Sequence, residues 1–144
     1  SVTHQDFTMH HVLDVDPAAA APIWRQIEAG MRRLVASGRL PAGAAVPSVR
    51  ELAKALRVNP ATVSKAYRRL TDAGLLMVRR GEGTFVADLS QGNLDQERQR
   101  LLDRGAAAFI RVASSVGASR REATRTVEDG WARETEGGEG ASDD

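Results

Sequence analysis

Apolar residues recur three or four positions apart over three consecutive stretches in the first half of the chain. This spacing places side chains on one face of a helix and predicts helices over residues 22–37, 48–56 and 59–73. The ends of the first stretch carry their own signals. Pro22 suits the first position of a helix, and Gly38 can adopt the left-handed conformation that stops one.

The second and third predicted helices are joined by a very short connection. Ser48 and Glu51 have the spacing of a capping box, in which each side chain satisfies a free backbone N–H at the helix start. Asn59 is a favourable N-cap, and Pro60 follows it at the first helical position. Two helices joined in this way are typical of a helix-turn-helix.

Two apolar runs with a preference for β structure follow these helices. Residues 75–80 and 84–86 flank a turn with the sequence Gly-Glu-Gly, which predicts a β-hairpin with Arg79 and Arg80 at its tip. We also expect a short edge strand over residues 11–15.

Helical spacing of apolar residues returns in the last third of the chain, in two stretches separated by Gly117. A capping box is expected at the start of each stretch, formed by Asn93 with Gln96 and by Ser119 with Glu122. The pattern therefore predicts two further helices.

The apolar positions on these two helices are too extended for the small preceding domain to bury. We expect them to form a two-fold interface between two copies of the chain, and a different protein partner is the competing use of the same surface. The residues assigned to this interface are Leu101, Leu102, Gly105, Phe109, Val112, Ala113, Val116, Val127 and Trp131. Gly105 has two interpretations, because it would either permit close approach of a second backbone or merely weaken its helix.

These patterns together predict a mainly α fold with a small β-hairpin. An N-terminal arm with the short strand occupies residues 1–21, and a winged helix-turn-helix domain occupies residues 22–88. The C-terminal helical dimerisation region covers residues 93–133. Residues 134–144 are rich in glycine and acidic side chains, which predicts a disordered tail.

Composition excludes several kinds of chemistry. The 144 residues include no cysteine, which rules out disulfides, a thiolate zinc site and a cysteine nucleophile. No apolar run approaches the roughly 20 residues that span a bilayer, so we expect no membrane association and a cytoplasmic location.

Charge is unevenly distributed along the chain although its net value is only +1. Residues 22–87 contain twelve Arg or Lys and four Asp or Glu, while the segments on both sides are acidic. A basic middle segment is typical of a surface that binds a polyanion, and a merely solvated charged face is the alternative.

The outer face of the third predicted helix is polar and cationic, which suits the major groove of B-DNA. The residues expected to contact DNA from this face are Ala61, Thr62, Ser64, Lys65 and Arg68. Arg50, in the first turn of the preceding helix, would lie near a phosphate. Arg79 and Arg80 would enter the minor groove or bind its backbone.

Other conspicuous side chains in this segment are assigned structural places. We expect the aromatic residues at the core or its edge, and three further cations on the solvated surface. The aromatic residues are Trp24, Tyr67 and Phe85, and the cations are Arg32, Arg33 and Lys54.

Four segments, in their order and spacing, resemble the GntR family of bacterial transcription regulators: residues 22–27, 46–53, 58–67 and 79–86. The brief C-terminal region resembles the YtrA-type subfamily in particular. This resemblance implies a winged-helix domain followed by two helices that mediate dimerisation. The DNA contacts that it implies are Arg50, Ala61, Thr62, Ser64, Lys65, Arg80 and Gly81.

The chain departs from the family pattern at three positions. Arg57 stands where the family commonly has glycine, so we expect a residue with positive φ before the third helix. Glu82 occupies a position in the wing that is often basic, and Ala21 replaces a more usual capping residue.

The sequence thus predicts a DNA-binding transcription regulator that acts as a repressor and binds a palindromic operator as a homodimer. A small-molecule effector of unknown identity is a further expected partner. The alternative is a winged-helix module that binds another protein without specific DNA binding. We expect no enzymatic activity, cofactor or metal site, since the three histidines, His4, His10 and His11, all fall in the N-terminal arm.

Overall fold

The computed structural model describes residues 13–139, which divide into two compact units, one extending to Arg100 and one beginning at Leu101. The elements of the first unit are α2 (Ile23–Ala36), β1 (Ala45–Val46), α3 (Val49–Leu56), α4 (Pro60–Asp72), β2 (Leu76–Arg79) and β3 (Gly83–Val86). Helix α5 (Gln91–Ser115) begins in the first unit and continues into the second, which also contains α6 (Arg120–Glu139).

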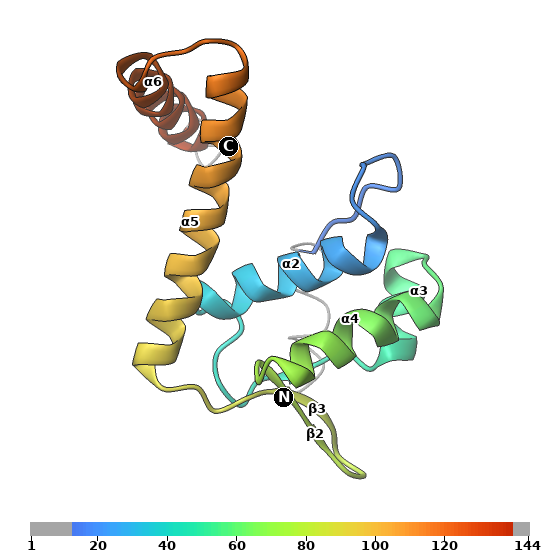
Figure 1. Ribbon diagram of the computed structural model, residues 1–144. Helices are drawn as coiled ribbons and strands as arrows, with labels where there is room; N and C mark the ends of the chain where they lie inside the picture. Colours follow the sequence, from blue (N-terminus) through green and yellow to red (C-terminus); the bar gives the residue numbers. More distant parts are fainter. Residues whose placement is uncertain (1–12, 140–144) are drawn as a thin grey trace. The chain divides into compact units, whose positions relative to one another are not determined.

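In the first unit, α4 packs against both α2 and α3, and the chain then turns into a hairpin that projects from the helices (Figure 1). The hairpin strands β2 and β3 pair antiparallel, with Leu76 opposite Val86 and Arg79 opposite Gly83. β1 adds to the other edge of β3, so the sheet order is β1-β3-β2. This arrangement confirms the predicted fold class of a winged helix-turn-helix with a small β component.

One core serves all of these elements. Its most deeply buried side chains come from every helix of the first unit except α5, from the hairpin, and from the segment before α2. They are Leu13, Ile27, Met31, Val35, Leu52, Val63, Leu70 and Val86. The helices and the wing therefore form one packed body, in which burial of apolar surface fixes the orientation of α4.

The N-terminal segment differs from the predicted edge strand. Residues 13–16 lie outside any strand, and residues 11 and 12 fall outside the described part of the chain. Leu13 is only 2% exposed, because it packs over Gly30 of α2, where an added Cβ would overlap the Leu13 side chain. The edge-strand prediction is therefore wrong for residues 13–15, where Leu13 packs against a helix instead of pairing in a sheet.

Two helix starts also differ from the predictions. Pro22 is the N-cap of α2 rather than its first residue. The predicted capping box of Asn93 and Gln96 is wrong, because α5 begins earlier, and the Oγ of Ser90 accepts a hydrogen bond from the backbone N–H of Asn93 at 3.2 Å.

The C-terminal helices follow the predicted order. Gly117 interrupts them with φ +75°, and the Oγ of Ser119 caps α6 by accepting from the N–H of Glu122 at 3.1 Å. The predicted disordered tail begins too early, since α6 extends to Glu139; residues 140–144 lie outside the described chain. Within the described residues, no helix has the length and apolar character to cross a membrane.

Candidate nucleic-acid interface

The turn between α3 and α4 depends on a left-handed residue. Arg57 has φ 58° and ψ 49°, and it is the C-cap of α3. The next backbone N–H, that of Val58, donates to the carbonyl of Ala53 at 3.0 Å and closes the helix end. The expected positive φ at this position is confirmed, and a non-glycine residue there stores backbone strain in the turn that orients α4.

The start of α4 is fixed by its cap and by a buried hydrogen bond. The Asn59 side chain accepts from the backbone N–H of Ala61 at 2.9 Å, with Pro60 in the first turn. Further along the helix, the Tyr67 hydroxyl donates to the carbonyl of Pro47 at 2.7 Å. This bond joins α4 to the segment just before α3, so the two helices keep one relative orientation.

The polar residues of α4 face away from the core as the sequence predicts. The side chains of Ala61, Lys65 and Arg68 are exposed, while those of Thr62 and Ser64 are half-buried. The inner face is formed by Val63, Ala66, Tyr67 and Leu70, all of them buried. The helix therefore presents small polar groups at its N-terminal end and cations further along.

Arg50 is exposed in the first turn of α3, close to the cap that Ser48 makes by accepting from the N–H of Glu51 at 3.1 Å. The positive end of a helix dipole and an arginine at the same place favour an anion there. Glu51 is the acidic group in the same turn.

The two arginines of the hairpin have different surroundings. The guanidinium of Arg79 lies over the ring of Phe85, 4.6 Å from its centroid, at a diagonal position on the paired strands. Arg80 and Gly81 are exposed in the turn, where Gly81 has φ +79° and Glu82 donates its N–H to the carbonyl of Arg79 at 2.9 Å. Gly81 therefore has a conformational role in the turn in addition to the expected contact role.

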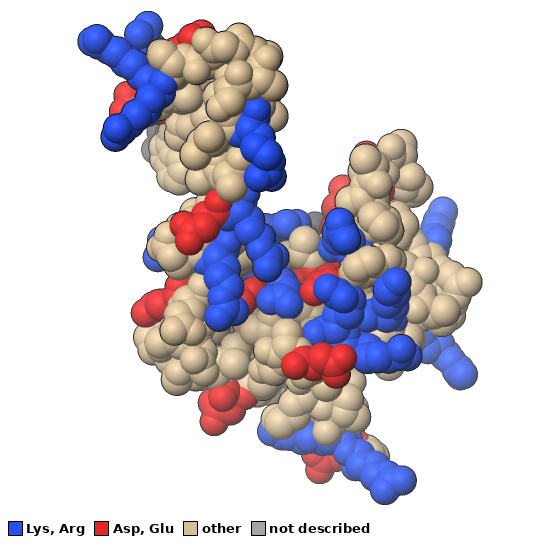
Figure 2. Space-filling view, viewed as in Figure 1, with Lys and Arg blue, Asp and Glu red and all other residues tan. Residues whose placement is uncertain are grey.

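Basic side chains gather on one face of the first unit. Figure 2 shows them over α2 and α4 and again at the hairpin, with an acidic patch between these two groups and acidic side chains beside the hairpin. The predicted contact residues come from three elements, α3, α4 and the hairpin, which belong to the same packed body.

Sequence reasoning missed a set of contacts between α2 and α4. Lys65 Nζ lies 4.4 Å, and Arg69 Cζ 4.9 Å, from the centroid of the Trp24 ring. Arg69 Nε also donates to Oε2 of Glu28 at 2.8 Å. Trp24 lies at the edge of the core, as expected, but its ring also supports cations of the candidate interface.

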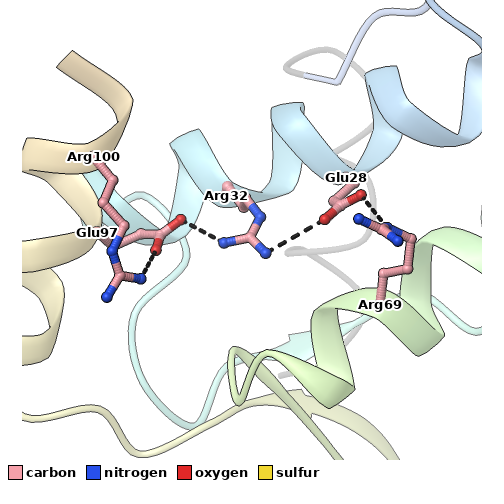
Figure 3. Close-up of polar contacts among 5 residues, drawn as sticks. All are labelled: Glu28, Arg32, Arg69, Glu97 and Arg100. Atoms are coloured by element: carbon pink, nitrogen blue, oxygen red, sulfur yellow. Dashed lines mark hydrogen bonds and ion pairs between the residues drawn. The ribbon is translucent and has the colours of Figure 1, made fainter. Parts of the chain in front are cut away.

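The Glu28 carboxylate belongs to a longer chain of ion pairs (Figure 3). Arg32 donates to Oε1 of Glu28 at 3.4 Å and to Oε1 of Glu97 at 2.8 Å, and Arg100 approaches the other oxygen of Glu97 at 3.4 Å. The assignment of Arg32 to the solvated surface is wrong, since its side chain is only 15% exposed; Arg33 and Lys54 are exposed as expected. The spacing of Glu28 and Arg32, four positions apart on a helix, was the available signal.

In the second unit, many apolar side chains have no cover within the described chain. Val112, Val116 and Trp131 are 60%, 75% and 72% exposed. Leu102 and Val127 are also exposed, Leu101 and Phe109 are half-buried, and Ala113 is buried. Ile110, which the sequence analysis did not assign, is exposed as well.

Six of these side chains line an open groove of about 790 Å³ between α5 and α6: Leu101, Leu102, Phe109, Ile110, Ala113 and Val127. A Cβ added at Gly105, on the groove wall, would meet nothing within 4 Å. Packing inside the described chain therefore does not require a glycine at this position.

The three packed helices and the paired hairpin define a winged helix-turn-helix protein. Residues 24–86 match the family described as "Bacterial regulatory proteins, gntR family". The HTH-type transcriptional repressor YtrA of Bacillus subtilis is 35% identical over 91 residues, which cover 63% of this chain and 70% of that protein. The chain belongs to the GntR family.

Solved structures agree with this assignment. A GntR family transcriptional regulator from Listeria monocytogenes has a TM-score of 0.70 and 27% identity, covering 80% of this chain and 98% of the other. YtrA from Sulfolobus acidocaldarius, a GntR-family transcription factor, has a TM-score of 0.52 and 34% identity, covering 67% and 98%. The YtrA-type resemblance is confirmed, and the matched family consists of regulatory proteins rather than enzymes.

Proposed function

We propose that this protein is a transcriptional repressor that binds a palindromic operator in double-stranded DNA as a homodimer, in the cytoplasm. The observation that carries the proposal is the exposed polar and cationic face of α4, held by the Asn59 cap and the Tyr67 hydrogen bond on a rigid winged helix-turn-helix body. The relatives named as transcriptional regulators support it.

Each part of the candidate interface has a distinct role in this proposal. Helix α4 enters the major groove, where its N-terminal residues contact base edges. The contacts from this helix, to base edges and to phosphates, are made by Ala61, Thr62, Ser64, Lys65 and Arg68. Arg50 contacts a phosphate beside the α3 N-terminus, and Arg79, Arg80 and Gly81 of the hairpin contact the adjacent minor groove or its backbone.

Dimerisation supplies the second half of the site. A single winged-helix domain contacts few base pairs, whereas two domains related by a two-fold axis read a palindrome and combine their binding free energies. The uncovered apolar side chains of the second unit support this role, because a contiguous apolar groove in water is stabilised by a partner surface. The interface comprises the residues predicted from the sequence, with Ile110 added.

Repression then follows because the bound dimer excludes polymerase from the promoter. A dimer on an operator that overlaps a promoter prevents polymerase from binding there, and an effector would act by changing the spacing of the two DNA-binding domains. This proposal assigns residues 22–88 to DNA binding and residues 93–133 to dimerisation.

The test is selection of duplexes from a random pool by the full chain, followed by titration of a recovered duplex at several salt concentrations. The expected result is a palindrome and an affinity that falls steeply with salt, with a slope of about 0.9 for each phosphate contact. Recovery of no common sequence, together with a flat salt dependence, would favour the alternative of a protein-interaction module.

A further inference from the structure

We propose that Trp24 and Glu28 of α2 are positioning residues that hold Lys65 and Arg69 of α4 ready for a DNA phosphate. The inference rests on the proposed DNA-binding function and extends it by a contact residue, Arg69, and by two residues that act through others. Trp24 and Glu28 lie one turn apart on α2, and Lys65 and Arg69 lie one turn apart on α4, so the two pairs meet side by side.

Arg69 is held at two points. Its Nε donates to Glu28 at 2.8 Å, and its Cζ lies 4.9 Å from the centroid of the Trp24 ring. Its side chain nevertheless remains 53% exposed. A guanidinium tethered through Nε keeps its two terminal nitrogens for a second, bidentate partner, and phosphate is an anion of matching geometry.

Glu28, which holds Arg69, is itself held in place. Glu28 is 8% exposed, and its other carboxylate oxygen accepts from Arg32, which is held in turn by Glu97 (Figure 3). A carboxylate bound from both sides cannot follow Arg69 into solvent. It therefore fixes the guanidinium on the surface of α4.

Lys65 is held by the Trp24 ring, with its Nζ 4.4 Å from the ring centroid. The indole face attracts the ammonium without neutralising it, so the full charge remains available to a phosphate. Long cationic side chains lose rotamer freedom when they bind, and ordering them beforehand removes that cost.

The position of Lys65 and Arg69 on α4 favours a contact with the DNA backbone rather than with the bases. Lys65 and Arg69 lie in the middle and towards the end of α4, whereas the N-terminal residues of a recognition helix meet base edges. A phosphate contact is independent of sequence, so the effect is measurable on any duplex.

The experiment compares wild type, Trp24→Leu, the double variant Lys65→Ala with Arg69→Ala, and the triple variant, each titrated with a random-sequence duplex at several salt concentrations. We expect Trp24→Leu to raise Kd about twofold to tenfold for each of the two cationic side chains, Lys65 and Arg69, that it frees from the ring. The salt slope should stay unchanged, because both cations still reach phosphate. We expect the double variant to reduce the slope of the salt dependence by roughly 1.8, because two phosphate contacts are lost. The triple variant should bind DNA no more weakly than the double variant.

Three matched variants separate positioning from folding. Trp24→Tyr keeps a ring and is expected to retain most of the affinity. Trp24→Met also lacks a ring, but its flexible, unbranched side chain adapts to irregular space at the core edge, and it replaces Trp24→Leu if thermal unfolding shows that variant to be unfolded. Arg25 is the control, because its Cζ lies 5.3 Å from the centroid of the same ring and it belongs to the same helix. In the Arg25→Ala background, Trp24→Leu should still weaken DNA binding only when Lys65 and Arg69 are present.

The inference would be overturned if Trp24→Leu lowered the DNA affinity equally in the wild-type and double-variant backgrounds. It would also be overturned if Trp24→Leu left the Kd of the wild type unchanged. Both results leave DNA binding by the wild type standing. Wild-type protein that retains no duplex at low salt would overturn the proposed function, and the inference with it.

Discussion

Nη1 of Arg32 on α2 donates to Oε1 of Glu97 on α5 at 2.8 Å, across 65 positions of the chain. Both carboxylates that Arg32 contacts, Glu28 and Glu97, are buried, at 8% and 5% exposure. A buried carboxylate is tolerated only where charged partners replace its water. Arg32 is therefore the central member of the ion-pair chain that joins α4, α2 and the first turns of α5.

Replacing Arg32 with methionine removes this shared partner while keeping most of the side-chain volume. We expect Arg32→Met to lower the free energy of unfolding by about 1–3 kcal/mol, because each carboxylate keeps one other arginine and is not left wholly unpaired. Urea unfolding measures the change. The control is Arg33→Met, at an exposed position next to it, which should stay within about 0.5 kcal/mol of wild type.

The left-handed residue at the end of α3 gives a second prediction. Arg57→Gly is expected to stabilise the fold by up to about 1 kcal/mol, because the strain of a non-glycine residue at φ 58° exceeds the added entropy of glycine in the unfolded chain. Arg57→Ala is the control, since it removes the same charge but keeps the Cβ. An equal rise in thermal midpoint for both variants would show that charge, not backbone strain, is the cause.

The parts of the fold that depend on local signals were predictable from the sequence. The caps at Ser48 and Asn59 and the hairpin around Gly81 follow from neighbouring residues, whereas the positive φ of Arg57 was expected only from the family resemblance. The exposed polar face of α4 follows from the spacing of its apolar residues. These signals were sufficient to predict the fold class and to propose the candidate interface.

What the sequence did not predict depends on residues far apart in the chain. The two-residue strand β1 exists because Ala45 and Val46 pair with Phe85 and Thr84 of β3. The contacts of Trp24 and Arg32 likewise depend on how α2 packs against α4 and α5. Periodicity shows that a helix has an inner face, but it does not show which charged side chains meet at the rim of that face.

Arg50 provides the direct test of the contact set on α3. We expect Arg50→Ala to weaken binding to a recovered operator by about 1–3 kcal/mol and to reduce the salt slope by about 1, because one phosphate contact is lost. Fluorescence anisotropy with labelled duplex measures both. Arg133→Ala, an exposed cation on α6, serves as the control. Unchanged affinity of Arg50→Ala would remove Arg50 from the interface.

The proposed dimer is tested on the second unit. Leu102 is 55% exposed and lines the apolar groove, so Leu102→Asp changes little within a single chain but places a charge in the proposed interface. Burying an unpaired carboxylate between two copies costs several kcal/mol, and we expect the variant to sediment as a monomer where wild type sediments as a dimer. Phe109→Asp, on the same groove, should act in the same way.

The matched control for this test is Val78→Asp, which places the same charge on an apolar side chain of the wing that is 66% exposed. It should leave the sedimentation coefficient of the dimer unchanged, because the wing is assigned to DNA rather than to the second copy. Dimers that persist in Leu102→Asp and Phe109→Asp would refute the interface. Dissociation by Val78→Asp instead would move the interface to the hairpin, where it would compete directly with the DNA contacts of Arg79 and Arg80.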